Sequence, residues 1–165
     1  MAQVTLGGTP VNTNGNLPAN GTILSDHPLV KADLSSTSIG DFKGKKVILN
    51  IFPSVDTSTC ATSVRTFNKK AASLENTVVL CISKDLPFAQ ARFCGAEGIE
   101  NVMTLSDFRN AAFSEELGVL LVDGAFTGLD ARAIVVLDEE GKVTHTELIS
   151  EIANEPDYKA ALAAL

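Results

Sequence analysis

Two runs of consecutive apolar residues mark the centre of the chain. Residues 46–52 (KVILNIF) and 77–83 (TVVLCIS) are apolar at nearly every position, a pattern typical of strands that are buried on both faces. Between them, over residues 60–74, apolar residues recur at spacings of four and three, which predicts a helix with one stripe of side chains facing the core. Thr57 or Ser58 can cap the start of this helix. The pattern therefore predicts a strand, a helix and a second strand in the middle of the chain.

On either side of this centre, turn residues separate shorter segments. Residues 7–10 (GGTP) lie between alternating apolar positions, which predicts a β-hairpin over about residues 1–16. Pro87 and Gly98 bound a predicted helix at 87–97, because proline is favoured at the first position of a helix and glycine just after its end. The other predicted elements are strands at 29–34, 102–105, 133–138 and 142–149 and helices at 110–117 and 156–165. Strands and helices thus alternate along most of the chain.

The order of these elements defines the predicted fold class. Strands that alternate with helices imply a central parallel or mixed β-sheet flanked by helices, and the hairpin before the last helix adds an antiparallel side to it. We therefore expect an α/β protein with a thioredoxin-like fold and an added N-terminal β-hairpin. The length of 165 residues suits one domain, so we expect residues 1–165 to form a single unit.

The balance of acidic and basic residues limits the kinds of partner that the protein is expected to bind. The chain has 13 Lys and Arg against 20 Asp and Glu, a net charge of −7, which argues against a nucleic-acid-binding surface because such surfaces cluster basic residues. The N-terminal residues lack the basic and apolar segments of a signal peptide, and no apolar run is long enough to span a bilayer. We expect a cytoplasmic protein without a membrane partner, in a compartment that keeps thiols reduced.

The three cysteines, Cys60, Cys81 and Cys94, are the main candidates for chemistry. Their odd number excludes a fully paired set of disulfides. The sequence has neither C-x-x-C nor H-x-x-x-H spacing, so it shows no recognisable metal site and we expect no metal.

Cys60 allows two interpretations. It lies on the apolar stripe of its helix, so it could be a small buried core residue. It also lies in the first turn of that helix, after a buried strand that ends at Pro53, where unpaired N–H groups and the positive end of the helix dipole favour a thiolate. Thr57, three residues earlier, could turn its hydroxyl towards the sulfur. The position favours a functional role without excluding the core role.

Cys81 and Cys94 differ in their surroundings. Cys81 lies among Val, Leu and Ile in the middle of a predicted buried strand, where the role of a small apolar residue explains it fully. Cys94 lies near the end of its helix, next to Gly95 and close to Gly98, and both glycines weaken the helix. A half-buried structural cysteine explains Cys94. Alternatively, it is a second redox thiol that reaches a partner only if the helix end unwinds, since a disulfide needs Cα atoms within about 7 Å.

Two arginines are candidates for a cation near Cys60. Arg65 follows Cys60 by five residues, which points it away from the face that carries the sulfur. Arg132 opens the predicted strand at 133–138. It could be a solvated strand end, or a cation that reaches Cys60 from a distant part of the chain.

The spacing around Cys60 resembles that of a known family. Pro53, Thr57 and Cys60 form the pattern P-x-x-x-T-x-x-C, which resembles the peroxiredoxin motif. The segment that contains Cys94 is similar to the resolving segment of the bacterial thiol peroxidases, the atypical two-cysteine subfamily of the peroxiredoxins. The segment around Arg132 resembles the one that holds the active-site arginine of this family. The resemblance extends over essentially the whole chain.

This resemblance implies a thiol-dependent peroxidase that reduces hydrogen peroxide and alkyl hydroperoxides in antioxidant defence. Cys60 would be the peroxidatic thiolate and become a sulfenic acid, and Cys94 of the same chain would then form with it a disulfide that thioredoxin reduces. Thr57 and Arg132 would hydrogen-bond the thiolate and the peroxide oxygens, and Pro53 would shield the site from water. The resemblance also implies a homodimer and no metal, haem or flavin cofactor.

Three other functions remain open from the sequence. A thioredoxin-fold redox sensor or binding module could use Cys60 and Cys94 for signalling, and only turnover with thioredoxin and its reductase distinguishes it from a peroxidase. A general disulfide oxidoreductase is disfavoured because C-x-x-C is absent. A globule with three buried thiols would not react with peroxide.

Overall fold

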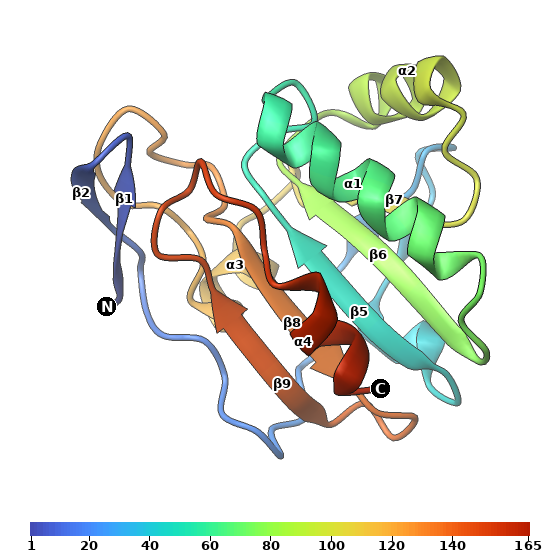
Figure 1. Ribbon diagram of the computed structural model, residues 1–165. Helices are drawn as coiled ribbons and strands as arrows, with labels where there is room; N and C mark the ends of the chain where they lie inside the picture. The colour runs from blue at the N-terminus through green and yellow to red at the C-terminus, as the bar shows by residue number, and fades with distance from the viewer.

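A mixed sheet of seven strands forms the centre of the protein in the computed structural model, which describes residues 1–165 (Figure 1). Its strands lie in the order β4 (Ser36–Thr37), β3 (Leu29–Val30), β7 (Met103–Ser106), β6 (Thr77–Ser83), β5 (Lys46–Ile51), β8 (Ala133–Leu137) and β9 (Val143–Leu148). β5, β6 and β7 are parallel, and the remaining pairs are antiparallel. Because β5 and β6 lie in the middle, nearly all their side chains are buried, as their apolar runs predicted.

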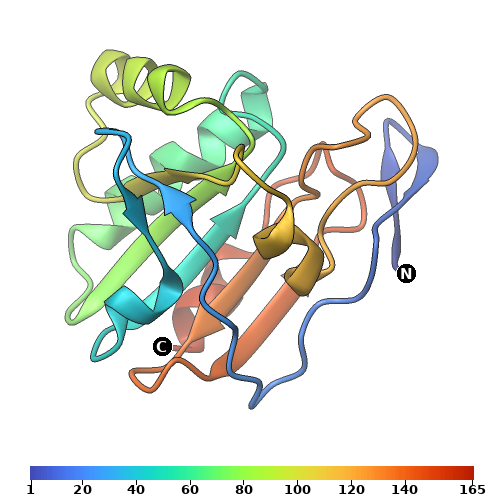
Figure 2. The ribbon, with the colours of Figure 1, turned by 180° about the vertical axis from the view of Figure 1, so that it is seen from behind.

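Helices cover both faces of this sheet. α1 (Ser58–Ala71), α2 (Pro87–Glu97) and α4 (Tyr158–Ala163) lie on one face, while α3 (Ala112–Leu117) and the 3-10 helix η1 (Ile39–Phe42) lie on the other (Figures 1 and 2). Each face buries its own cluster of apolar side chains. This arrangement confirms the predicted thioredoxin-like α/β fold. None of the helices is both long enough and apolar enough to cross a membrane.

The predicted N-terminal hairpin is present as a separate pair of strands, β1 (Gln3–Leu6) and β2 (Thr9–Asn12). Its turn, Gly7 and Gly8, has φ values of 58° and 81°, which glycine adopts without strain. The carboxylate of Glu151 accepts hydrogen bonds from both glycine N–H groups, and Asp123 accepts two from the end of β2. The hairpin is therefore fixed to two loops from the C-terminal half of the chain.

The structure corrects the predicted boundaries at both ends of the chain. The strand predicted at 29–34 stops after two residues, because Leu34 turns the chain with a φ of 70° and its N–H donates to the carbonyl of Lys31. β4 and η1 were not predicted, since so few residues show no periodicity. The closing helix predicted from 156 begins two residues later, where the side chain of Asp157 caps it by accepting a hydrogen bond from the N–H of Ala160.

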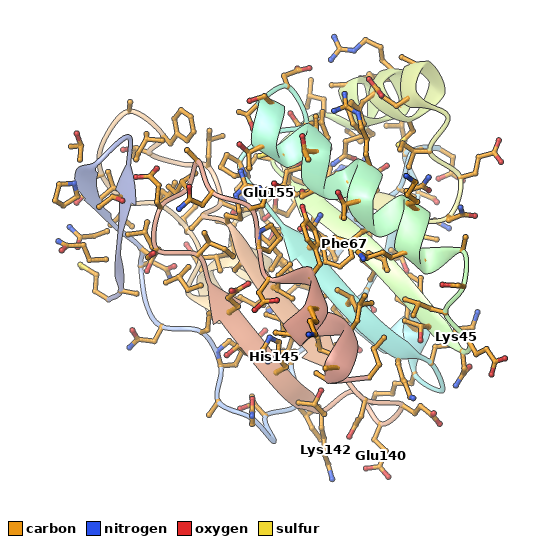
Figure 3. The ribbon with its side chains drawn as sticks, in the orientation of Figure 1. Lys45, Phe67, Glu140, Lys142, His145 and Glu155 are labelled. Atoms are coloured by element: carbon orange, nitrogen blue, oxygen red, sulfur yellow. The ribbon has the colours of Figure 1, made fainter.

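A substitution at Phe67 tests how α1 packs on the sheet. Its ring is fully buried and meets Tyr158 of α4 edge to face, with the ring centroids 5.1 Å apart (Figure 3). We expect Phe67→Ala to lower the free energy of unfolding by about 3–5 kcal/mol, because it removes a large buried ring and leaves a cavity. Phe88→Ala, at an exposed position of α2, should change it by less than about 0.5 kcal/mol. Urea denaturation followed by circular dichroism measures both, and equal losses in the two variants would contradict this packing.

Candidate active site

Cys60 lies in the first turn of α1, which follows the carboxyl end of β5. Thr57 is the N-cap of the helix, with extended backbone angles, and Cys60 is the third helical residue. The first N–H groups of a helix have no partner within it, so partial positive charge gathers near the sulfur. Cys60 is also fully buried and belongs to the apolar cluster beneath α1. Both interpretations of Cys60 are therefore compatible: it is a core residue at the electropositive end of a helix.

Arg132 is the cation next to Cys60. It directly precedes β8, whose antiparallel pairing with β5 sets Ala133 opposite Ile51. Nη2 of Arg132 donates a hydrogen bond to Sγ of Cys60 at 3.1 Å, and Nε donates to the carbonyl of Ile152 at 2.8 Å. Arg132 is 1% exposed and forms no ion pair with a carboxylate. A guanidinium keeps its charge even when buried, and the sulfur of Cys60 is the side-chain atom that lies beside this charge.

One donor of Arg132 has no partner. Its Nη1 is buried without a hydrogen bond, and Arg132 lines a cavity of about 150 Å³. Cys60 itself is fully buried and does not line the cavity. The guanidinium can therefore donate to an oxygen atom that enters the cavity while Nη2 remains on the sulfur.

Pro53 and Thr57 line the same cavity, so the structure brings two of the three residues of the P-x-x-x-T-x-x-C pattern to it. The hydroxyl of Thr57 donates to the carbonyl of Ser54 at 3.1 Å and makes no hydrogen bond with the sulfur of Cys60. Its hydrogen must rotate away from Ser54 before Thr57 can donate to the sulfur or to an oxygen in the cavity. Thr57 is thus at the site, with its donor directed elsewhere.

Asp85 fixes the loop that carries Pro53 and Thr57. The sequence alone did not identify this residue. It follows β6, the parallel neighbour of β5, so the two loops leave the sheet at the same edge. Its carboxylate accepts hydrogen bonds from the hydroxyl of Ser54 at 2.6 Å and from the N–H of Val55 at 2.8 Å. A carboxylate two residues after the end of a buried strand, beside the strand that leads to Cys60, was the signal that could have identified it.

The apolar wall of the cavity comes from three distant segments. Leu6 of the hairpin, Phe126 and Ile152 provide it. Hydrogen bonds from the hydroxyl of Thr5 and from three backbone N–H groups lower the pKa of Glu151 to about 2, so its carboxylate stays ionised and keeps the hairpin against the loop that carries Ile152. The contacts of Glu151 with the hairpin join residues more than 140 positions apart, which no local sequence pattern reveals.

Cys94 lies on α2, over the opposite half of the sheet from Arg132. Its sulfur is 4.0 Å from Oγ1 of Thr104 on β7, and burial raises its pKa. β7 and β8 are separated in the sheet by β6 and β5, so they lie about 14 Å apart, at three strand spacings. All three cysteines are free thiols. The structure therefore does not bring Cys94 to Cys60, and a disulfide between them requires α2 to move.

Cys81 lies in the middle of β6 with its side chain fully buried. Burial raises the pKa of its thiol to about 12. Nδ2 of Asn50, on the neighbouring β5, lies 3.6 Å from its sulfur. These surroundings support the structural role predicted for Cys81, and they add a polar neighbour that the apolar strand pattern did not indicate.

Neither histidine belongs to the cavity. Nε2 of His27 lies 2.6 Å from Oε2 of Glu116 on the surface. His145 lies on β9 (Figure 3), and its Nε2 is buried without a partner. No group of three or more His, Cys, Asp or Glu side chains is arranged to hold a metal ion.

Comparison with known proteins identifies close relatives. The family model described as Redoxin matches residues 12–162. The chain is 58% identical, over 165 residues, to a protein of Mycobacterium tuberculosis named thiol peroxidase, and 56% identical to a thiol peroxidase of Corynebacterium glutamicum. In both comparisons the match covers 100% of this chain and 99% of the relative.

Solved structures share the fold. A peroxiredoxin-like protein from Aquifex aeolicus matches with a TM-score of 0.93 and 37% identity, covering 99% of this chain and 96% of that one. A thiol peroxidase from Chromobacterium violaceum matches with a TM-score of 0.90 over 98% of this chain and 93% of its own. Its sequence identity is 22%, so this second likeness is one of fold.

The raised pKa of Cys81 leads to a chemical test. The thiolate is the form that reacts with iodoacetamide, so Cys81, with a pKa of about 12, should be modified far more slowly in the folded protein than in the unfolded chain at mildly alkaline pH. Raising the pH should speed its modification only as the pKa is approached. Mass spectrometry of peptides from a pH series measures this, and equal rates in the folded and unfolded protein would contradict the assignment.

Proposed function

The chain belongs to the redoxin family and is similar over its whole length to thiol peroxidases, and from this premise we propose that it is an atypical two-cysteine peroxiredoxin in which Cys60 is the thiol that reduces peroxide. As an enzyme it is a thiol-dependent peroxidase with an antioxidant function. The observation that carries the proposal is the contact of 3.1 Å between Nη2 of Arg132 and Sγ of Cys60. Of the three cysteines, only Cys60 has a buried cation beside its sulfur.

In the first step, the thiolate of Cys60 attacks the terminal oxygen of a hydroperoxide. A sulfur–oxygen bond forms as the oxygen–oxygen bond breaks, and the transferred oxygen keeps its hydrogen. The sulfur is oxidised to a sulfenic acid, and the leaving oxygen takes a proton to become water or an alcohol. Negative charge therefore moves from the sulfur to the leaving oxygen during this step.

Arg132 is placed to stabilise both ends of this charge movement. Nη2 holds the sulfur, and Nη1, which has no partner, can donate to the leaving oxygen. Donors that are fixed before the reaction lower the barrier most where charge develops. In this proposal Thr57 turns its hydroxyl to the peroxide, and Pro53 excludes water from the sulfur.

The proposed substrates are hydrogen peroxide and alkyl hydroperoxides. A cavity of about 150 Å³ admits a small peroxide. Its wall of Leu6, Phe126 and Ile152 supports the binding of an alkyl group, because it buries apolar surface.

In the second step, we propose that Cys94 resolves the sulfenic acid. The sulfur of Cys94 attacks the sulfur of Cys60, a disulfide forms, and the hydroxyl of the sulfenic acid leaves as water with the proton of the Cys94 thiol. Thioredoxin then reduces the disulfide by exchange and is itself oxidised. The raised pKa of Cys94 supports this division of roles, because it keeps Cys94 protonated while Cys60 meets the peroxide. A homodimer is part of the same proposal.

Two cysteine variants test the cycle. Cys60→Ser should abolish turnover of peroxide with thioredoxin and its reductase, because it removes the nucleophile. Cys94→Ser should consume one equivalent of peroxide and stop at the sulfenic acid. Rapid mixing measures the peroxide consumed, and mass spectrometry identifies which cysteines pair.

Each result has a clear contrary outcome. Turnover retained by Cys60→Ser would overturn the assignment of the nucleophile, and normal cycling of Cys94→Ser would overturn the assignment of the resolving thiol. A wild-type protein that forms the disulfide but does not turn over with thioredoxin would be a redox sensor instead.

The role of Arg132 has its own test. Arg132→Lys keeps the charge but loses the planar fork that reaches the sulfur and the entering oxygen together. We expect kcat/KM for peroxide to fall about 10²–10³-fold, the usual cost of losing a donor that stabilises developing charge. Arg109→Lys, on the exposed surface, is the matched control and should keep full activity. Stopped-flow kinetics measures both, and an Arg132→Lys variant as fast as the control would refute this role.

A further inference from the structure

Arg65 of α1 holds the last turn of α2 at the surface of the protein. Its Nε and Nη2 donate to the two carboxylate oxygens of Glu97, at 2.8 and 2.9 Å. Its guanidinium also lies over the ring of Phe93, with Cζ 5.9 Å from the ring centroid. Arg65 therefore contacts α2 at two positions one turn apart. Its side chain points away from the sulfur of Cys60, as its spacing from Cys60 predicted.

Other contacts between the two regions are also polar and exposed. Oδ1 of Asn68, one turn beyond Arg65, accepts hydrogen bonds from the N–H groups of Glu100 and Asn101, which follow α2. Arg92 pairs with Asp56, just before α1, at 2.7 Å, with both side chains 63% exposed. Polar and charged contacts at the surface thus hold the second half of α2 and the residues that follow it.

Few apolar contacts hold α2 in place. Only Pro87, Gln90 and Phe93 of this helix are buried. Gly95 lies within its last turns, and the helix ends at Gly98, whose φ is 65°. Because glycine gains more backbone freedom on unwinding than other residues, this end of the helix opens at low cost.

Cys94 lies in the part of α2 between the two residues that Arg65 contacts. It directly follows Phe93 and precedes Glu97 by three residues. To leave Thr104 and reach Cys60, Cys94 must move with the last turn of α2, and this turn is free only when Arg65 releases Glu97 and Phe93.

We propose that Arg65 and Glu97 form a latch that sets how fast Cys94 reaches the oxidised Cys60. Neither side chain contacts a reacting sulfur, so both are positioning residues. This inference rests on the proposed roles of Cys60 and Cys94, and it goes beyond them by assigning control of the second step to one ion pair.

The latch determines which of two reactions the sulfenic acid of Cys60 undergoes. When it opens, the thiol of Cys94 and the sulfenic acid of Cys60 give a disulfide and one water. When it stays closed, a second hydroperoxide transfers an oxygen atom to the same sulfur, giving a sulfinic acid and a second water or alcohol. The strength of the latch therefore determines how much peroxide the enzyme withstands before it is inactivated.

Glu97→Gln tests the latch, because it removes the charge and keeps the shape. In rapid mixing with peroxide, the first phase, oxidation of Cys60, should be unchanged, and disulfide formation should become about two- to fivefold faster, the range expected from an exposed ion pair. At a fixed excess of peroxide, the fraction of Cys60 found as sulfinic acid by mass spectrometry should fall. Amide hydrogen exchange over residues 87–98 of the reduced enzyme should become faster by a similar factor.

Two matched experiments separate the latch from a general effect of charge. Glu140→Gln removes a carboxylate from the exposed Lys142–Glu140 pair, at the opposite end of the molecule from α2 (Figure 3), and should change neither phase. The exchanged pair, Arg65→Glu with Glu97→Arg, should restore the wild-type rate of disulfide formation, which a purely structural role of either residue does not predict. Added salt should speed disulfide formation in the wild-type enzyme and hardly affect Glu97→Gln.

The contrary outcomes are distinct. Unchanged disulfide formation in Glu97→Gln, whether or not amide exchange becomes faster, would refute the latch and leave the proposed function standing. A wild-type enzyme that forms no Cys60–Cys94 disulfide would refute the resolving role of Cys94, and the latch with it. If Glu97→Gln fails to fold, Arg65→Lys, which keeps the charge but loses the two-pronged contact, is expected to act in the same direction.

Discussion

A guanidinium buried beside a thiol, without a carboxylate to neutralise it, is the constraint on which the rest of this structure depends. Such a charge is costly in the interior of a protein unless it is hydrogen-bonded and balanced. The carbonyl of Ile152 fixes one nitrogen of Arg132, the sulfur of Cys60 takes the second, and the third is unused. The register between β5 and β8 sets this geometry, since a slip of one residue would turn Arg132 to the other face of the sheet. Sheet pairing, and not only the local motif, therefore determines the chemistry of the sulfur.

Local patterns in the sequence predicted the elements that are long and buried. The apolar runs of β5 and β6 and the apolar stripe of α1 were sufficient to predict the strand–helix–strand centre and the helical turn that carries Cys60. The partner of the sulfur could not be derived in this way, because Arg132 is 72 positions away and spacing alone left it as a solvated strand end or a cation. The resemblance to peroxiredoxins supplied that residue. Asp85 and Glu151 were missed for the same reason, since their partners come from other segments of the chain.

The sheet also separates the two thiols of the proposed cycle. In the resting protein both thiols are free, and the sulfur of Cys94 lies beside Thr104 of β7 while that of Cys60 lies beside Arg132, which precedes β8. The segments that carry the two thiols also differ in local stability. The strands beneath Cys60 are almost wholly buried, whereas the last turns of α2 are held to α1 by exposed polar contacts, and segments of the second kind are the ones that open locally while the rest of a protein stays folded.

The hydrogen bonds between the hairpin turn and Glu151 join the two ends of the chain, across 143 and 144 positions. Contacts of such high sequence separation form late, because the loop between them must close first. On the ribosome, a growing chain exposes Cys60 long before Arg132, Ile152 and Glu151 have been synthesised. Until then the sulfur has no cation beside it and no cavity around it. The proposed reactive thiol therefore acquires its surroundings only after synthesis has passed residue 152.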